Sequence, residues 1–204
     1  MSKKLLLSTA LAAGTIALSA HAQEADSRYH NYIKGFGGVT AINELSESYL
    51  GYSAEVEIDT GFVVGVAAGV SFDNFELEGE VAYRKADTGD ATVSYGGYSY
   101  SAPIDGEVNA TSFMVNTWYN FGLGQKLDGY AGGGIGTVKS EAKGYGYSDD
   151  TTDFGWQVGA GVAMPLESGF SVGVGYRYFS VPEVGELESD VTSNDLVFEV
   201  KKKF

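Results

Sequence analysis

The stretch FELEGEVAYRK, Phe75 to Lys85, decides the fold because its alternate positions differ sharply in chemistry. One set is apolar or aromatic apart from a glycine: Phe75, Leu77, Gly79, Val81 and Tyr83. The other set includes three carboxylates and a guanidinium: Glu76, Glu78, Glu80 and Arg84. Successive side chains of a β-strand point to opposite faces, so the stretch predicts a strand with one oily face and one charged face. The fold depends on which face points inward.

The same period of two recurs along the chain, and helical periodicity is hard to find. The chain contains 29 glycines, 3 prolines and 14 tyrosines, a composition that favours strands and turns. Eight strands are predicted, at residues 31–42, 62–72, 75–85, 110–121, 127–138, 153–164, 169–180 and 195–204. The first of them alternates too poorly for its faces to be assigned.

The connections between these strands alternate in length. The long ones are residues 43–59, 87–108, 139–152 and 181–192, and the short ones are 73–74, 122–126 and 165–168. This alternation predicts an all-β fold, an eight-stranded antiparallel up-and-down barrel with tight turns at one rim and long loops at the other. Twelve residues tilted by about 40° rise about 30 Å, enough to span an apolar band of about 25 Å.

The N-terminal residues predict export. Two lysines precede an apolar run that ends at Ala20-His21-Ala22, which is the pattern of a secretory signal peptide cleaved after residue 22. The expected organisation is a signal peptide (1–22), a short periplasmic segment (23–30) and the barrel (31–204). Removing residues 1–22 leaves 11 basic and 27 acidic residues, a charge of −16 that argues against a nucleic-acid partner. Without cysteine, no disulfide or thiol chemistry is expected.

Three features indicate that the oily face points outward, toward lipid. Aromatic residues stand near the ends of the apolar faces, as in Phe62 with Phe72, which suits the two interfaces of a membrane. The opposite face is rich in glycine, which suits a crowded lumen. The last strand ends on an aromatic residue, Phe204. The alternative is a soluble periplasmic barrel of the lipocalin kind, with its oily face turned toward a ligand.

The segments TSFMVNTWYNFG (111–122) and FGWQVGAGVAMPLESGFSVGVGYRYF (154–179), with Phe204, resemble small outer-membrane β-barrel proteins of Gram-negative bacteria, the OmpA/OmpX-like group. The resemblance implies an outer-membrane location, surrounded by lipid and lipopolysaccharide. It also implies that the assembly machinery reads the terminal strand, at Phe198, Val200 and Phe204. Lys202 departs from the family pattern, which usually has an aromatic or apolar residue there.

With the oily face outward, charged side chains collect in the lumen. The predicted network consists of Glu76, Glu78, Glu80, Arg84, Arg177, Glu199 and Lys201, and Lys203 and Lys34 are further candidates. Buried charges are tolerated when paired, so the glutamates are expected to pair with Arg84, Arg177 and the terminal lysines, and Glu199 to reach Arg177 or Lys34. The alternative is an ion or proton path lined by the glutamates.

Catalysis, cofactors and metals are not expected. His30 is the only histidine after residue 22, and no nucleophile with a base can be argued from the sequence. The three glutamates of the opening stretch occupy every second position of one strand, which is more typical of the inner wall of a barrel than of an acid–base cleft. No phosphate-binding loop or zinc-ligand cluster is visible.

The long loops carry the candidates for contact with an extracellular ligand. These are Tyr95, Tyr98, Tyr100, Tyr145 and Tyr147. Tyrosine among serine and glycine forms adaptable recognition surfaces, although tyrosine is also a common strand residue that could simply extend the strands beyond the membrane. The predicted function is therefore a plugged barrel with a structural or surface-interaction role in the envelope. A narrow passive channel for small solutes remains the alternative.

Overall fold

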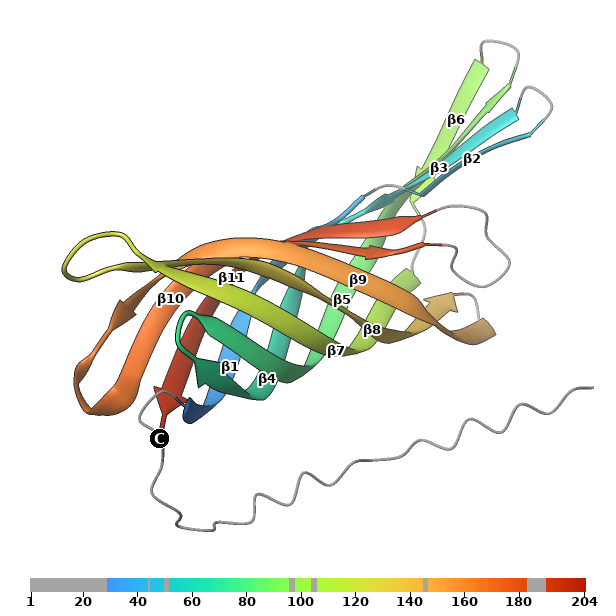
Figure 1. The fold of residues 1–204 in the computed structure, drawn as a ribbon. Helices are drawn as coiled ribbons and strands as arrows, with labels where there is room; N and C mark the ends of the chain where they lie inside the picture. Colours follow the sequence, from blue (N-terminus) through green and yellow to red (C-terminus); the bar gives the residue numbers. More distant parts are fainter. Residues whose placement is uncertain are drawn as a thin grey trace, which may run out of the picture.

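A computed structural model describes residues 29–43, 45–49, 52–95, 98–103, 106–144, 147–182 and 190–204. Eight strands form a closed ring (Figure 1). They are β1 (Tyr29–Ile42), β4 (Gly61–Phe72), β5 (Phe75–Tyr95), β7 (Gly106–Gly122), β8 (Asp128–Gly144), β9 (Tyr147–Pro165), β10 (Phe170–Val181) and β11 (Val191–Lys203). Among the described residues, no helix is long and apolar enough to cross a membrane. The predicted signal peptide and residues 23–28 lie outside the described residues.

The ring closes between its first and last strands. β1 and β11 are antiparallel, and their register pairs Lys34 with Lys201 and Phe36 with Glu199. The backbone N–H of Phe204 also donates to the carbonyl of Asn31, at 2.9 Å. Since every neighbouring pair around the ring is antiparallel, the prediction of an eight-stranded up-and-down barrel is confirmed. β1 begins at Tyr29, so the predicted N-terminal segment 23–30 overlaps the barrel by two residues.

The tight turns occur where they were predicted, within one or two residues. Asp73 and Asn74 connect β4 to β5, and Asp73 has a φ of 48°, in the left-handed region that Asp and Asn tolerate. Residues 123–127 connect β7 to β8. Leu166 and the short 3₁₀ helix Glu167–Gly169 connect β9 to β10. Short turns mark the periplasmic rim of barrels of this type, so the opposite rim is extracellular.

At the extracellular rim, the predicted loops 43–59, 87–108 and 139–152 are wrong, because most of their backbone forms strands. The additional strands are β2 (Leu45–Tyr49), β3 (Tyr52–Ile58) and β6 (Tyr98–Pro103). They pair in the order β2–β3–β5–β6 and project beyond the rim (Figure 1). The bilayer limits the height of the apolar band but not the hydrogen-bonded ladder, which continues as far as strand-forming residues allow. Of the fourth predicted loop, residues 183–189 lie outside the described residues.

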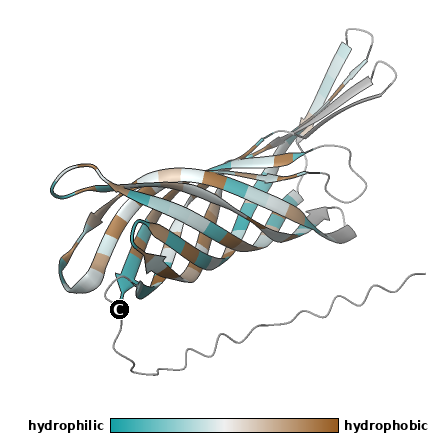
Figure 2. Cartoon of the chain, in the orientation of Figure 1, coloured by the Kyte–Doolittle hydropathy of each residue, from teal (hydrophilic) through white to brown (hydrophobic). Residues whose placement is uncertain are grey.

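The oily face is the outer face of the barrel. Hydrophobic and hydrophilic bands alternate along the barrel strands (Figure 2). On β7, Phe113 and Val115 are exposed outward, while Ser112 and Asn116 are fully buried. Aromatic pairs mark the two ends of this face. Two pairs lie near the short turns: Tyr29–Phe72 and Phe75–Tyr119, with ring centroids 4.6 and 5.1 Å apart. Two pairs lie nearer the other rim: Phe62–Tyr83 and Trp156–Tyr178, with ring centroids 6.1 and 5.5 Å apart.

The backbone register resolves the faces of the first strand. Tyr32, Lys34 and Phe36 point inward and are buried, while Ile33 and Val39 are exposed outward. Three glycines in this strand have no side chain to show which face they occupy, which hid the alternation in the sequence.

The lumen contains apolar side chains as well as the polar ones that were predicted. One buried cluster consists of Phe36, Val63, Ala82 and Val197. The other consists of Met114, Val138, Phe179 and Val181, with Ala110 packed against it. Such residues sit at inward positions of strands that are otherwise polar inside, so the lumen is filled rather than hollow.

Glycines in the lumen make room for one large ring. The ring of Tyr130 lies over Gly161 and Gly175, and a Cβ added at Gly175 would stand 2.1 Å from the Tyr130 hydroxyl oxygen. We expect Gly175→Ala to lower the free energy of unfolding by about 1–3 kcal/mol, because the core would be overpacked. Urea unfolding in lipid vesicles would measure the effect.

The matched control for this variant is Gly79→Ala. Gly79 faces outward, and a Cβ added there meets nothing within 4 Å. The control should therefore leave the stability almost unchanged. Equal stability of the two variants would show that Tyr130 moves aside at no cost.

Candidate functional site: the charged lumen

The inward side chains of β5 organise the lumen. Glu76, Glu78, Glu80 and Arg84 are all at least 98% buried. Residues two apart on a strand share a face and are separated by about 6.6 Å along it, so each side chain lies at a different height in the barrel. The contacts of these four side chains define four levels, from the periplasmic end to the extracellular end.

The first level is the periplasmic end. The Lys201 ammonium lies 2.7 Å from one Glu76 oxygen, and the Lys203 ammonium lies 3.5 Å from the other. The Lys203 side chain is 42% exposed, whereas the Lys201 side chain is 10% exposed. Lys201 is therefore the buried partner of Glu76, and Lys203 is the partly exposed partner at the rim.

At the second level, Glu78 accepts four hydrogen bonds. The ammonium of Lys34, the hydroxyl of Tyr32 and the indole N–H of Trp118 each donate at 2.8 Å. The amide of Asn116 donates at 3.2 Å. A buried carboxylate with this many donors is fully compensated for its lost hydration.

At the third level, Glu80 and Arg177 form a buried ion pair. Arg177 Nη1 donates to Glu80 Oε2 at 2.9 Å, and Gln157 Nε2 donates to Glu80 Oε1 at 3.2 Å. The second carboxylate beside Arg177 is Glu199, whose Oε2 lies 3.7 Å from Nη2. The Arg177 guanidinium therefore lies beside two carboxylates, that of Glu80 on β5 and that of Glu199 on β11.

At the fourth level, Arg84 pairs with Asp195. The Nε and Nη2 atoms of Arg84 donate to Asp195 Oδ2, at 3.0 and 2.8 Å, and Nη1 donates to the Ser112 hydroxyl at 3.1 Å. The Thr40 hydroxyl donates to the other Asp195 oxygen at 2.6 Å. The Phe179 ring covers the guanidinium, with its centroid 3.9 Å from Cζ.

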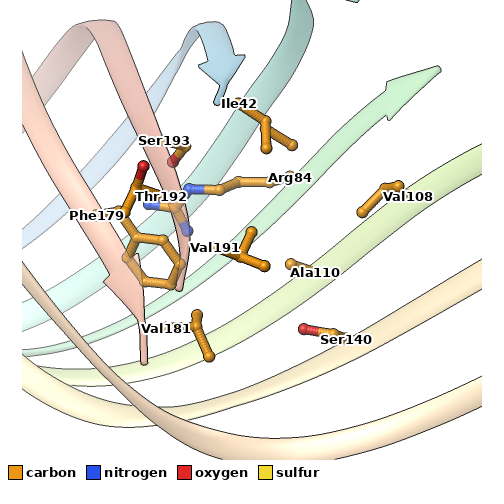
Figure 3. A pocket seen from close by; sticks show the side chains of 10 residues that line it. All are labelled: Ile42, Arg84, Val108, Ala110, Ser140, Phe179, Val181, Val191, Thr192 and Ser193. Carbon is orange, nitrogen blue, oxygen red and sulfur yellow. The ribbon is translucent and has the colours of Figure 1, made fainter. Parts of the chain in front are cut away.

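Above Arg84 the lumen ends in a small apolar cup (Figure 3). It is lined by Ile42, Arg84, Val108, Ala110, Ser140, Phe179, Val181, Val191, Thr192 and Ser193. Its cavity has a volume of about 40 Å³, room for only a few water molecules. From the extracellular side, the cup therefore leads to the Arg84–Asp195 pair.

The structure brings all seven predicted lumen residues to the inner wall, with both further candidates, Lys34 and Lys203. Among the described residues, five carboxylates and five basic side chains meet there: Glu76, Glu78, Glu80, Asp195 and Glu199 with Lys34, Arg84, Arg177, Lys201 and Lys203. Of the two partners expected for Glu199, the structure brings Arg177 within reach, while Lys34 pairs with Glu78.

The expected pairing of Arg84 with a glutamate is wrong, since its partner is Asp195. Asp195 was missed as a member of the network, although it alternates in phase with Glu199 and Lys201 on the last strand. That phase could have identified it. Four neutral hydrogen-bond donors were missed as well, because nothing in the sequence shows which polar side chains meet across the lumen. They are Tyr32, Asn116, Trp118 and Gln157.

The other predicted residues lie outside the lumen. Phe198, Val200 and Phe204 face outward and are exposed, and Tyr95, Tyr98 and Tyr100 are exposed on the strands beyond the rim. Tyr147 begins β9, and Tyr145 lies outside the described residues.

Lys202, which departs from the pattern of the resembled family, turns toward the periplasmic rim. Its ammonium donates to the carbonyl of Ser168 and stands 4.6 Å from the centre of the Phe170 ring. A lysine can thus occupy this outward position by directing its charge to the interface.

Comparisons with known proteins agree with this architecture. The family model described as outer membrane protein beta-barrel domain matches residues 9–204. A comparison with curated proteins finds no match.

Among solved structures, Neisserial surface protein A is 21% identical, with a TM-score of 0.58, over 85% of this chain and 97% of that one. OprG from Pseudomonas aeruginosa is 14% identical, with a TM-score of 0.52, over 86% and 96%. Ail of Yersinia pestis is 16% identical, with a TM-score of 0.46, over 86% and 98%.

The structural likeness supports the barrel fold, and the family model covers nearly the whole chain. Together they confirm the predicted outer-membrane location and exclude the soluble periplasmic alternative. The chain belongs to the outer membrane protein beta-barrel domain family.

Proposed function

We propose that this protein is a non-conducting barrel, with a structural role in the envelope and an extracellular surface for contact. The observation that carries the proposal is the stack of four charged levels, in which β5 is joined across the lumen to β1, β10 and β11. An eight-stranded barrel is only just wide enough to be filled by side chains, and here large ones fill it. Among the residues that the structure describes, Trp118, Arg177 and Tyr32 have the largest fully buried side chains.

The pairing of the charges favours a plug over an ion or proton path. A path needs sites that an ion can enter and leave, whereas each lumen carboxylate here has at least one cationic partner within 4 Å. Opening a path would require breaking these pairs, in which each charge compensates the lost hydration of its partner.

The proposal includes no catalytic step and no cofactor. His30 is exposed at the periplasmic start of β1. Within the described part of the chain, no three His, Cys, Asp or Glu side chains are grouped so as to hold a metal ion. The buried glutamates are held by structural partners rather than around a cleft.

The remaining predictions complete the proposal. Residues 1–22 direct export and are removed, and the assembly machinery reads the outward aromatic and apolar residues Phe198, Val200 and Phe204. Lipid and lipopolysaccharide surround the barrel, and no nucleic acid is a partner. The extracellular strands provide the contact surface.

Conductance across a planar lipid bilayer tests the plug. The purified protein should show no steady current steps, because no passage crosses the levels of paired charge. The control variant is Trp118→Ala, which removes the largest fully buried side chain and should produce measurable openings. Uniform steps from the unmodified protein would instead establish a narrow passive channel.

A further inference from the structure

The extracellular sheet β2–β3–β5–β6 has two chemically distinct faces. The register pairs Tyr95 with Tyr98 and Val93 with Tyr100, and we call the face that these four side chains occupy the tyrosine face. It also pairs Ser94 with Ser99 and Thr92 with Ser101, which form the serine face. Facing residues of paired antiparallel strands share a face, and neighbouring residues along each strand lie on opposite faces.

The row of tyrosine positions extends across the whole sheet. The backbone register places Tyr52 beside Tyr95 and Tyr49 beside Tyr52. Each of the four strands, from β2 to β6, thus carries one tyrosine in the same row of paired positions. Two of the predicted loops, 43–59 and 87–108, therefore contribute to one sheet, which forms only when their strands pair.

The serine face is satisfied internally. The hydroxyls of Ser94 and Ser99 lie 2.8 Å apart, and those of Thr92 and Ser101 lie 2.7 Å apart. The tyrosine face is different, since Tyr98 is 84% exposed and Tyr100 is 75% exposed. Exposed aromatic side chains gathered on one face of a sheet are typical of a binding surface.

The charge of the sheet indicates which class of partner the sheet can bind. Residues 45–49, 52–58, 87–95 and 98–103 carry Glu47, Glu55, Glu57, Asp87 and Asp90 and no lysine or arginine. This negative charge repels a second copy of the chain and repels anionic lipopolysaccharide and polyanionic glycans. It attracts cations, and the faces of tyrosine rings bind guanidinium and ammonium groups.

We propose that the tyrosine face binds an arginine- and lysine-rich segment of a polypeptide partner. Basic side chains of the segment stack on Tyr98 and Tyr100, and the surrounding carboxylates provide long-range attraction. This inference rests on the surface-contact part of the proposed function and names the chemistry of the partner.

Fluorescence anisotropy with a labelled octa-arginine peptide tests the proposal on the whole barrel in nanodiscs of zwitterionic lipid. Tyr98→Ala/Tyr100→Ala should weaken binding about tenfold, because two cation–π contacts are lost while the net charge is unchanged. Ser99→Ala/Ser101→Ala, at alternate positions of the same strand, should bind like the unmodified protein. Tyr98→Phe/Tyr100→Phe should retain most of the affinity, because the ring faces remain.

Three results would overturn the inference. Equal affinities of the tyrosine and serine variants would mean that the peptide responds to net charge alone. Tighter binding of lipopolysaccharide than of octa-arginine, lost in the tyrosine variant, would assign the face to lipid. Self-association that the tyrosine variant abolishes would assign it to a second copy. Conductance is measured separately, so failure here leaves the proposal of a plugged barrel intact.

Discussion

Replacing Arg177 with methionine should lower the free energy of unfolding by about 3–5 kcal/mol, the cost typical of removing one partner from a buried ion pair. Methionine has a similar shape, so little volume is lost. The carboxylates of Glu80 and Glu199 would lose their shared guanidinium while staying in the lumen. Urea unfolding in lipid vesicles measures the free energy, and the temperature at which the folded band disappears from detergent gels gives a second measurement.

The matched control is Lys203→Met. Lys203 also neutralises a lumen glutamate, but its side chain is 42% exposed, and Glu76 keeps Lys201 at 2.7 Å. The control should cost less than about 1 kcal/mol, as a surface ion pair does. If Arg177→Met unfolded at the same urea concentration as the unmodified protein, the lumen would be wet and the ion pairs would contribute nothing to stability.

Arg84→Met and Asp195→Asn should each destabilise the barrel by about 3–5 kcal/mol, and the double variant should recover most of that loss. Each single variant leaves one buried charge without its counterion, whereas the double variant removes both charges. Asparagine retains an oxygen that can accept from the Thr40 hydroxyl. The coupling energy from the four unfolding curves measures the pair directly.

Additive losses in this cycle would contradict the pairing of β5 with β11 across the lumen. They would mean that each charge is compensated separately, by water or by other side chains. A pair of residues from distant levels offers a control, since Glu76→Gln with Asp195→Asn removes charges at opposite ends of the lumen and should show no coupling.

Much of the barrel could be predicted from FELEGEVAYRK and its counterparts. A strand that crosses a membrane must alternate, because one face contacts lipid and the other the lumen, and alternation is visible in sequence. The tight turn at Asp73-Asn74 is equally local. Local signals therefore predicted eight strands, the periplasmic turns and the inward position of Glu76, Glu78 and Glu80.

Local signals did not predict how far the strands continue or what meets across the lumen. Lys201 and Glu76 are 125 residues apart and Arg84 and Asp195 are 111 apart, so their pairing depends on the register at which the whole barrel closes. The sequence by itself determined which faces are oily and which are charged, because that follows from the period of a strand. Only the tertiary structure decided which charges pair and which tyrosines share a surface, because barrel closure and strand register bring together residues that are distant along the chain.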